Sequence, residues 1–271
     1  MTDPVIALFE QEWSQLESLC SGLTEAQWAA ATECPGWSVQ DQLAHIIGTE
    51  SSLAGLPRPE GFEPEDPIGY VHNEIGRLNE IWVASLRPSA GAEVLARFLV
   101  VRDLRLSQLR GFSPERFDEV GPTPVGQAPY REFMNVRVMD CWVHEQDIRR
   151  AVDLSGHLSG PIVEHSLGRF VPAMAMVVGK RAGATEGQSV AFELTGEAAR
   201  RFAVVVVEGR AQVLAEVPEA PTATLRMDAE TWWCLCLGRW TPGRVRRHGL
   251  VEVAGDAQLA NATIDNLSFM I

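Results

Sequence analysis

Two side chains in the middle of the chain have the types and the spacing of metal ligands. Asp140 and His144 stand four residues apart in the segment 130–153, which has no Gly or Pro and predicts a helix. Side chains four apart on a helix lie on one face, a turn apart, as in the HExxH helices that bind zinc. The pair could therefore hold a divalent metal ion, and it could equally form a hydrogen bond between helix neighbours.

The same helix carries a polar stripe where a bundle helix normally carries an apolar one. Arg137, Asp140, His144 and Asp147 alternate at spacings of three and four residues, and apolar positions flank them on both sides. The opposite face is expected to be solvated and carries Glu145, Gln146, Arg149 and Arg150. Because unpaired buried charges are costly, a polar stripe between apolar flanks indicates a buried polar pocket.

A third candidate ligand, His45, lies much earlier in the chain. Ser38, followed three residues later by Asp41, resembles a capping box and predicts a helix over 38–55 that contains His45. A lone histidine in such a helix is typical of a hydrogen-bonded core residue. Together with the pair on the later helix, however, it would supply three protein ligands and leave one position open, as catalytic zinc requires.

Helical periodicity recurs throughout the first half of the chain. The predicted helices cover residues 3–20, 24–31, 38–55, 70–86, 93–109 and 130–153. Between them lie a proline-rich loop at 56–69, which could cover a pocket, and a Pro/Gly-rich connection at 111–130. Substantial helices joined by loops favour a four-helix bundle, whose binding sites lie between facing helices.

The composition changes after residues 155–156, where a Ser and a Gly separate the two halves. A helix is predicted at 161–180, and strands are predicted at 189–194, 202–207, 211–215, 223–227 and 251–254. Two more helices are predicted at 229–237 and 256–266. Strands followed by helices predict an α+β domain with a mainly antiparallel sheet. We therefore expect two domains, 1–155 and 156–271.

The composition also limits the partners and the location of the protein. A net charge of −13 argues against nucleic acid or an anionic membrane as a partner, because both need a positive surface. The acidic start lacks the apolar core of a signal peptide, and no apolar run reaches membrane-spanning length. The five cysteines have no framework spacing, and Cys234 and Cys236 are expected to be core residues. We expect a soluble, cytoplasmic protein.

The chain resembles the mycothiol-dependent maleylpyruvate isomerase family, and two segments carry the resemblance. They are CPGWSVQDQLAHIIGTE at 34–50 and MDCWVHEQDIRR at 139–150. In this family a His of the second bundle helix, and an acidic residue four before a His on the last bundle helix, bind a divalent metal, usually zinc. The matching residues here are His45, Asp140 and His144.

The resemblance covers essentially the whole chain. It implies that residues 1–155 form a DinB-like metal-binding four-helix bundle and that residues 156–271 form a domain of the sterol-carrier-protein type. In the isomerase that names the family the acidic ligand is Glu, so Asp140 is shorter by one methylene. Either the helices lie slightly closer here, or this ligand is weaker.

The resemblance implies an enzyme that uses a divalent metal, expected to be zinc, with mycothiol or a related thiol as cosubstrate. A metal-bound thiol is deprotonated, and the thiolate would add to a small electrophilic substrate. Departure of the thiol after a bond rotation gives a cis–trans isomerase, and its retention gives an S-transferase. A monomer or a homodimer is expected.

Arg137 and Arg77 are the candidate catalytic residues, because either could bind a substrate carboxylate. For Arg137 the alternative is a salt bridge to Asp140 or to another helix neighbour. For Arg77 the sequence does not fix the face of the helix on which it lies.

Two other functions stay open. In a zinc hydrolase the open position would hold a water of lowered pKa, and Glu50 or Asp147 would have to act as general base. In a non-catalytic binding protein the metal site would be degenerate. The remaining histidines have no partner at ligand spacing and are expected on the surface or in loops: His72, His157, His165 and His248.

Overall fold

The helices of the first half begin and end where capping residues place them. The computed structural model describes residues 3–63, 68–124 and 126–270. The helices are α1 Pro4–Ser21, α2 Glu25–Trp28, α3 Val39–Leu53, α4 Glu74–Leu86, α5 Gly91–Gly111, α6 Pro114–Asp118 and α7 Tyr130–Ala151. The predicted capping box is present, because Ser38 Oγ accepts from the Asp41 amide at 3.3 Å and Asp41 Oδ2 accepts from the Ser38 amide at 2.9 Å. This cap fixes the start of α3 and so the direction in which His45 points.

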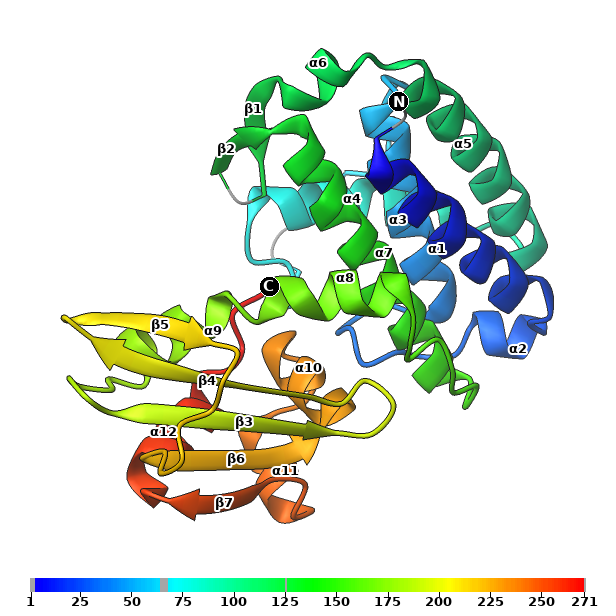
Figure 1. The fold of residues 1–271 in the computed structure, drawn as a ribbon. Coiled ribbons are helices and arrows are strands. Elements are labelled where there is room, and N and C mark those ends of the chain that lie inside the picture. Colours follow the sequence, from blue (N-terminus) through cyan, green and yellow to red (C-terminus); the bar gives the residue numbers. More distant parts are fainter. Residues whose placement is uncertain (1–2, 64–67, 125, 271) are drawn as a thin grey trace. The chain divides into compact units, whose positions relative to one another are not determined.

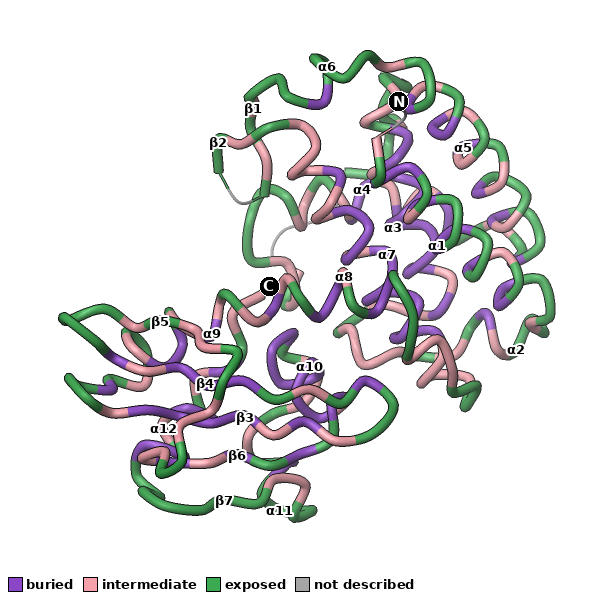
Figure 2. The backbone as a smooth tube through the Cα atoms, in the orientation of Figure 1, coloured by how far each residue is buried: buried purple, intermediate pink, exposed green. Residues whose placement is uncertain are grey.

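Helices α1, α3, α5 and α7 form a four-helix bundle (Figure 1). Helix α1 packs against α5 and α7, and α3 also packs against α5 and α7, while α4 lies against α3. The inward faces carry large apolar side chains, and Figure 2 shows buried residues along α1, α3 and α7. Among the fully buried side chains are Phe9, Trp13, Leu43, Phe98 and Trp142. The predicted four-helix bundle is confirmed.

The connection between α5 and α7 is more ordered than its Pro/Gly content predicts. It contains the short helix α6 and an antiparallel hairpin of β1 Val120–Thr123 and β2 Gly126–Pro129. Ser113 caps α6 by accepting from the Arg116 amide, and Gly126 takes a φ of 100°, which favours glycine. Elements of four or five residues are too short for periodicity to reveal.

The second half forms a mixed sheet with helices. The strands are β3 Ser189–Thr195, β4 Arg200–Val207, β5 Arg210–Leu214, β6 Ala223–Asp228 and β7 Glu252–Gly255. Their order is β5-β4-β3-β6-β7, in which β3 and β6 pair in parallel and all other neighbours are antiparallel. The predicted α+β class with a mainly antiparallel sheet is confirmed.

The helices of this half differ from prediction in two places. They are α8 Pro161–Phe170, α9 Ala173–Met176, a π-helical turn Val177–Arg181, α10 Ala229–Cys236, α11 Pro242–Arg247 and α12 Ala257–Asp265. The single helix predicted over 161–180 is interrupted at Pro172, because proline lacks the amide hydrogen that a continuous helix needs. The short helix α11 was not predicted. Cys234 and Cys236 are buried and form no disulfide, as expected of core residues.

The chain divides into two compact units, Met1–His157 and Leu158–Ile271. The predicted domain limits, 1–155 and 156–271, stay a prediction. Residues 64–67 of the proline-rich loop at 56–69 lie outside the described residues, so its expected position over a pocket also stays a prediction. Among the described residues, no helix is both long enough and apolar enough to cross a membrane.

The close approach of α3 and α4 depends on a missing side chain. A Cβ added at Gly48 would lie 2.5 Å from Trp82 Cβ, whereas one at Gly76 would meet its nearest atoms at 3.5 Å. Gly48→Ala should therefore lower the melting temperature, because overpacking costs about 1–3 kcal/mol. Gly76→Ala, the matched control, should leave it unchanged or raise it. Equal shifts in thermal unfolding would contradict this reading of the helix contact.

Candidate metal site

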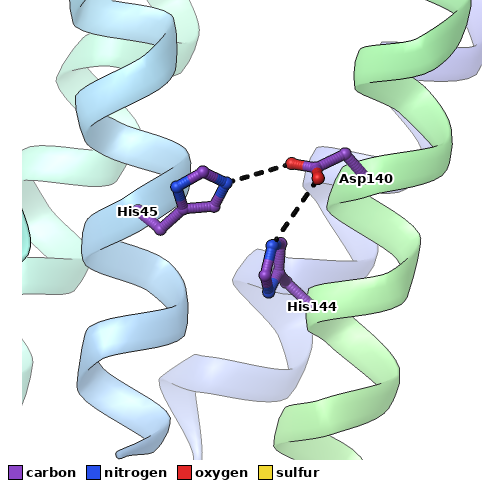
Figure 3. A group of neighbouring side chains, drawn as sticks. All are labelled: His45, Asp140 and His144. Carbon is purple, nitrogen blue, oxygen red and sulfur yellow. Dashed lines mark hydrogen bonds and ion pairs between the residues drawn. The ribbon is translucent and has the colours of Figure 1, made fainter. Parts of the chain in front are cut away.

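The three predicted ligands meet between α3 and α7 (Figure 3). His45 points from α3 toward Asp140 and His144 of α7, with His45 Nε2 3.1 Å from Asp140 Oδ2. His144 Nε2 lies 3.7 Å from Asp140 Oδ1. One ligand atom from each residue lies within 4.8 Å of the other two, a spacing at which they could hold one metal ion.

Burial and charge put these groups in the protonation states that a metal needs. His45 is 5% exposed, and burial lowers its pKa to about 4, although the hydrogen bond that it donates to Asp140 acts in the opposite direction. Its imidazole is therefore neutral at neutral pH. Burial raises the pKa of Asp140, but the charge of Arg137, together with the contacts of the two histidines, outweighs burial and holds that pKa well below its usual range. The site thus offers a neutral imidazole and an ionised carboxylate.

A short chain of hydrogen bonds fixes the orientation of His144. Its Nδ1 lies within hydrogen-bond distance of Gln42 Oε1. Gln42 Nε2 in turn donates to Thr32 Oγ1 at 2.7 Å, which turns the amide oxygen toward the imidazole. The hydrogen therefore belongs on Nδ1, and Nε2 keeps its lone pair on the side of Asp140. Such outer contacts commonly set the tautomer of a metal-binding histidine.

An aromatic wall closes one side of the site. The ring of Trp37 lies 5.2 Å from the ring of His45 and 5.9 Å from that of His144. Its Nε1 donates to Glu80 Oε2 at 3.0 Å, so the indole is held by α4. Trp37 and Gln42 lie in the segment that carries the family resemblance, but residue types alone did not assign them to the site.

Arg137 pairs with two carboxylates, of which Glu50 is buried and Asp140 is partly exposed. Its Nε donates to Glu50 Oε1 at 3.0 Å and its Nη1 donates to Asp140 Oδ2. The alternative predicted for Arg137, a salt bridge to Asp140, is thus present. Arg105 Nε donates to the second oxygen of Glu50 at 3.0 Å. Because two arginines occupy both oxygens of Glu50, its predicted role as a general base is disfavoured.

The two remaining candidates have partners of their own. Asp147 Oδ1 accepts from Arg150 Nη2, and its other oxygen lies 3.8 Å from His144 Nδ1. Arg77 Nη2 lies 3.8 Å from Glu63 Oε2. A role of Arg137 or Arg77 toward a substrate carboxylate stays a prediction.

The face of α7 that was expected to be solvated is buried at Glu145 and Gln146 and half-buried at Arg149 and Arg150, so that prediction is wrong. Glu145 and Gln146 are almost completely inaccessible, because α1 packs against this side of α7. His157, which was expected to lack a partner, places Nδ1 2.6 Å from Glu145 Oε2. The sequence held one signal of this arrangement: Glu12 interrupts the apolar face of α1 between Phe9 and Trp13.

The contacts of Arg137 predict a structural contribution. Arg137→Ala would leave Asp140 and Glu50 each without one buried partner, and losing one member of a buried ion pair costs about 3–5 kcal/mol. The control is Arg110→Ala, which removes an exposed pair with Glu10 and should cost at most about 1 kcal/mol. Urea unfolding measures both. Similar losses in the two variants would mean that Arg137 does not support the fold.

Comparison with solved structures identifies the fold. The crystal structure of a mycothiol-dependent maleylpyruvate isomerase matches with a TM-score of 0.56 and 14% identity, over 89% of this chain and 92% of that chain. A histidine-to-alanine variant of that isomerase matches with a TM-score of 0.54 and 16% identity, over 95% and 97%. At these identities the likeness establishes the fold.

Sequence comparison gives relatives and a family. Two uncharacterized proteins from strains of Mycobacterium tuberculosis are 26% identical over 157 residues, which is 55% of this chain and 56% of each relative. The chain thus spans little more than half the length of these curated relatives. Residues 177–266 match the SCP-2 sterol transfer family. Residues 9–149, more than half of the chain, match the mycothiol maleylpyruvate isomerase N-terminal domain, and the chain belongs to that family.

Proposed function

We propose that this protein is a metal-dependent enzyme that uses mycothiol, or a related low-molecular-weight thiol, to act on a small electrophilic substrate as an isomerase or an S-transferase. The observation that carries the proposal is the meeting of His45, Asp140 and His144 within 4.8 Å between two bundle helices. The family supports the thiol, because the solved isomerase of the same fold is described as mycothiol-dependent.

The donor set fits a divalent ion such as zinc. Two imidazole nitrogens and one carboxylate oxygen are ligands that zinc accepts, and three protein ligands leave a position open. Asp140 contributes one negative charge, which leaves the site of a divalent ion with a net positive charge. A bound ion would favour the deprotonated form of a coordinating thiol, which is the nucleophile.

The protein's own residues prepare the site for this chemistry. Gln42 orients His144, and Trp37 shields both imidazoles on one side. Arg137 holds the Asp140 carboxylate and keeps it ionised. The substrate and the thiol must then approach from a side that these residues leave open. An electrophile that carries a carboxylate would need a cation there, for which Arg137 and then Arg77 are the candidates.

Isomerisation and thiol transfer share their first half. In both, the thiol sulfur forms a bond to an unsaturated carbon, and the electron pair moves onto the substrate. In the isomerase the carbon–sulfur bond breaks again after rotation, and the electron pair re-forms the double bond. In the transferase the bond stays, and the substrate takes up a proton. The partners are thus a small-molecule substrate and a thiol cosubstrate. We place the reaction in the cytoplasm, where small thiols are kept reduced.

Metal content tests the site directly. The variant His45→Ala/His144→Ala should lose about one equivalent of divalent metal per chain relative to the parent protein, because only one ligand of the three remains. Asp140→Glu should retain more metal than Asp140→Ala, because the carboxylate is preserved. His72→Ala, at an exposed histidine, is the control. Mass-spectrometric metal analysis after dialysis gives the counts, and unchanged content in the double variant would reject the site.

Thiol dependence tests the reaction. With maleylpyruvate as the trial substrate, turnover should require added mycothiol or a mimic, because the thiol supplies the nucleophile. It should also require the protein, because a free thiol has a pKa near 8.5 and reacts slowly at neutral pH. Cobalt-loaded protein should gain a sulfur-to-metal absorption band on adding thiol, and His45→Ala/His144→Ala should not. Product analysis separates isomer from thioether. Equal turnover without any thiol would favour the hydrolase alternative instead.

A further inference from the structure

A second cluster of metal-ligand types lies on the opposite side of α7. Glu12 of α1 is fully buried, and neither of its carboxylate oxygens has a hydrogen-bond partner. It lies on the inward face of α1, among apolar residues such as Phe9 and Trp13. A buried carboxylate without a partner is costly, and such groups are normally paired, protonated or bound to a metal. The burial of the Glu12 carboxyl group is therefore unexplained by the site between α3 and α7.

Two further ligand types face Glu12. His157 Nδ1 lies 3.8 Å from Glu12 Oε2 and 2.6 Å from Glu145 Oε2. Glu145 is also fully buried, and its other oxygen accepts from Arg149 Nε at 2.7 Å. One ligand atom each of Glu12, Glu145 and His157 lies within 4.8 Å of the other two.

The cluster places two buried carboxyl groups beside one guanidinium, that of Arg149, and one imidazole, that of His157. Burial, followed by the charge of Glu145, raises the pKa of Glu12 well above its usual range. Without an ion, Glu12 is therefore favoured in its protonated form. A divalent ion at the same point would replace that proton and satisfy both carboxylates.

The cluster is separate from the site that faces α3. Glu145 directly follows His144, and successive side chains on a helix point about 100° apart. His144 therefore faces α3, and Glu145 faces α1. His157 is fixed independently, because its backbone carbonyl accepts from Trp142 Nε1 at 3.1 Å and from Gln146 Nε2 at 3.4 Å.

We propose that Glu12, Glu145 and His157 form a second divalent-cation site. Two carboxylate oxygens and one imidazole nitrogen suit Zn²⁺, Mn²⁺ or Fe²⁺. The ion would join α1, α7 and the segment that follows α7, so its effect is on stability. The side chain of His157 is 11% exposed, so it is the member of the cluster that lies nearest to solvent. This inference does not rest on the proposed reaction.

The experiment uses the full chain with the first site removed. In a His45→Ala/His144→Ala background, stripped with chelator and equilibrated with Zn²⁺ alone, we expect about one bound equivalent and a higher melting temperature than without Zn²⁺. Adding Glu12→Gln should abolish both effects. It should not destabilise the metal-free protein, because a neutral amide replaces a buried carboxyl group. His157→Gln, as a second variant, should also abolish binding.

The matched control is Glu10→Gln, an exposed position of α1 that pairs with Arg110, and it should keep the bound Zn²⁺. A background protein that binds no Zn²⁺ would overturn the proposal and leave the two carboxyl groups as a proton-sharing pair. Binding that survives both Glu12→Gln and His157→Gln would overturn it too, because the ion would then lie elsewhere. Since the background lacks His45 and His144, neither result depends on whether the proposed enzyme function is correct.

Discussion

The burial of charged side chains on two faces of α7 is the constraint on which the rest of the bundle depends. Helix α3 covers one face and α1 covers another. Every ionised group on these faces loses its hydration, and in a poorly polarisable interior only a nearby partner offsets that loss. The network in which Arg137 and Arg105 share Glu50 meets this requirement with 3.0 Å contacts. The positions of α3 and α5 relative to α7 follow from the same contacts.

This constraint also determines how Asp140, the candidate acidic ligand, is held. Asp140 is one methylene shorter than glutamate, so its carboxylate stays close to the backbone of α7. Arg137, three residues earlier, donates to Asp140 Oδ2, and His45 reaches the same oxygen from α3. The carboxylate is thus held from both sides and stays ionised. The opposite oxygen, Oδ1, faces His144. The shorter side chain is compensated by its partners.

The sequence could predict the parts of the site that follow from helix geometry. The spacing of Asp140 and His144, and the capping box that begins α3, each depend on contacts between near neighbours, which the sequence displays directly. The buried face with Glu145 was missed because periodicity assigns one inward face to a helix, whereas α7 has two. The partnership of Glu12 with His157 joins residues far apart in the chain, and only the packing of α1 on α7 creates it.

The position of Trp37 could not be predicted from the sequence either, because it depends on contacts between separate helices. The first of these contacts involves a glycine. Gly48 has no Cβ, so Trp82 of α4 can lie against α3. That approach brings Glu80, also on α4, within 3.0 Å of Trp37 Nε1. The indole is thereby held beside the rings of both imidazole ligands. A glycine on α3, one turn from His45, thus helps to position the indole beside the two candidate imidazole ligands.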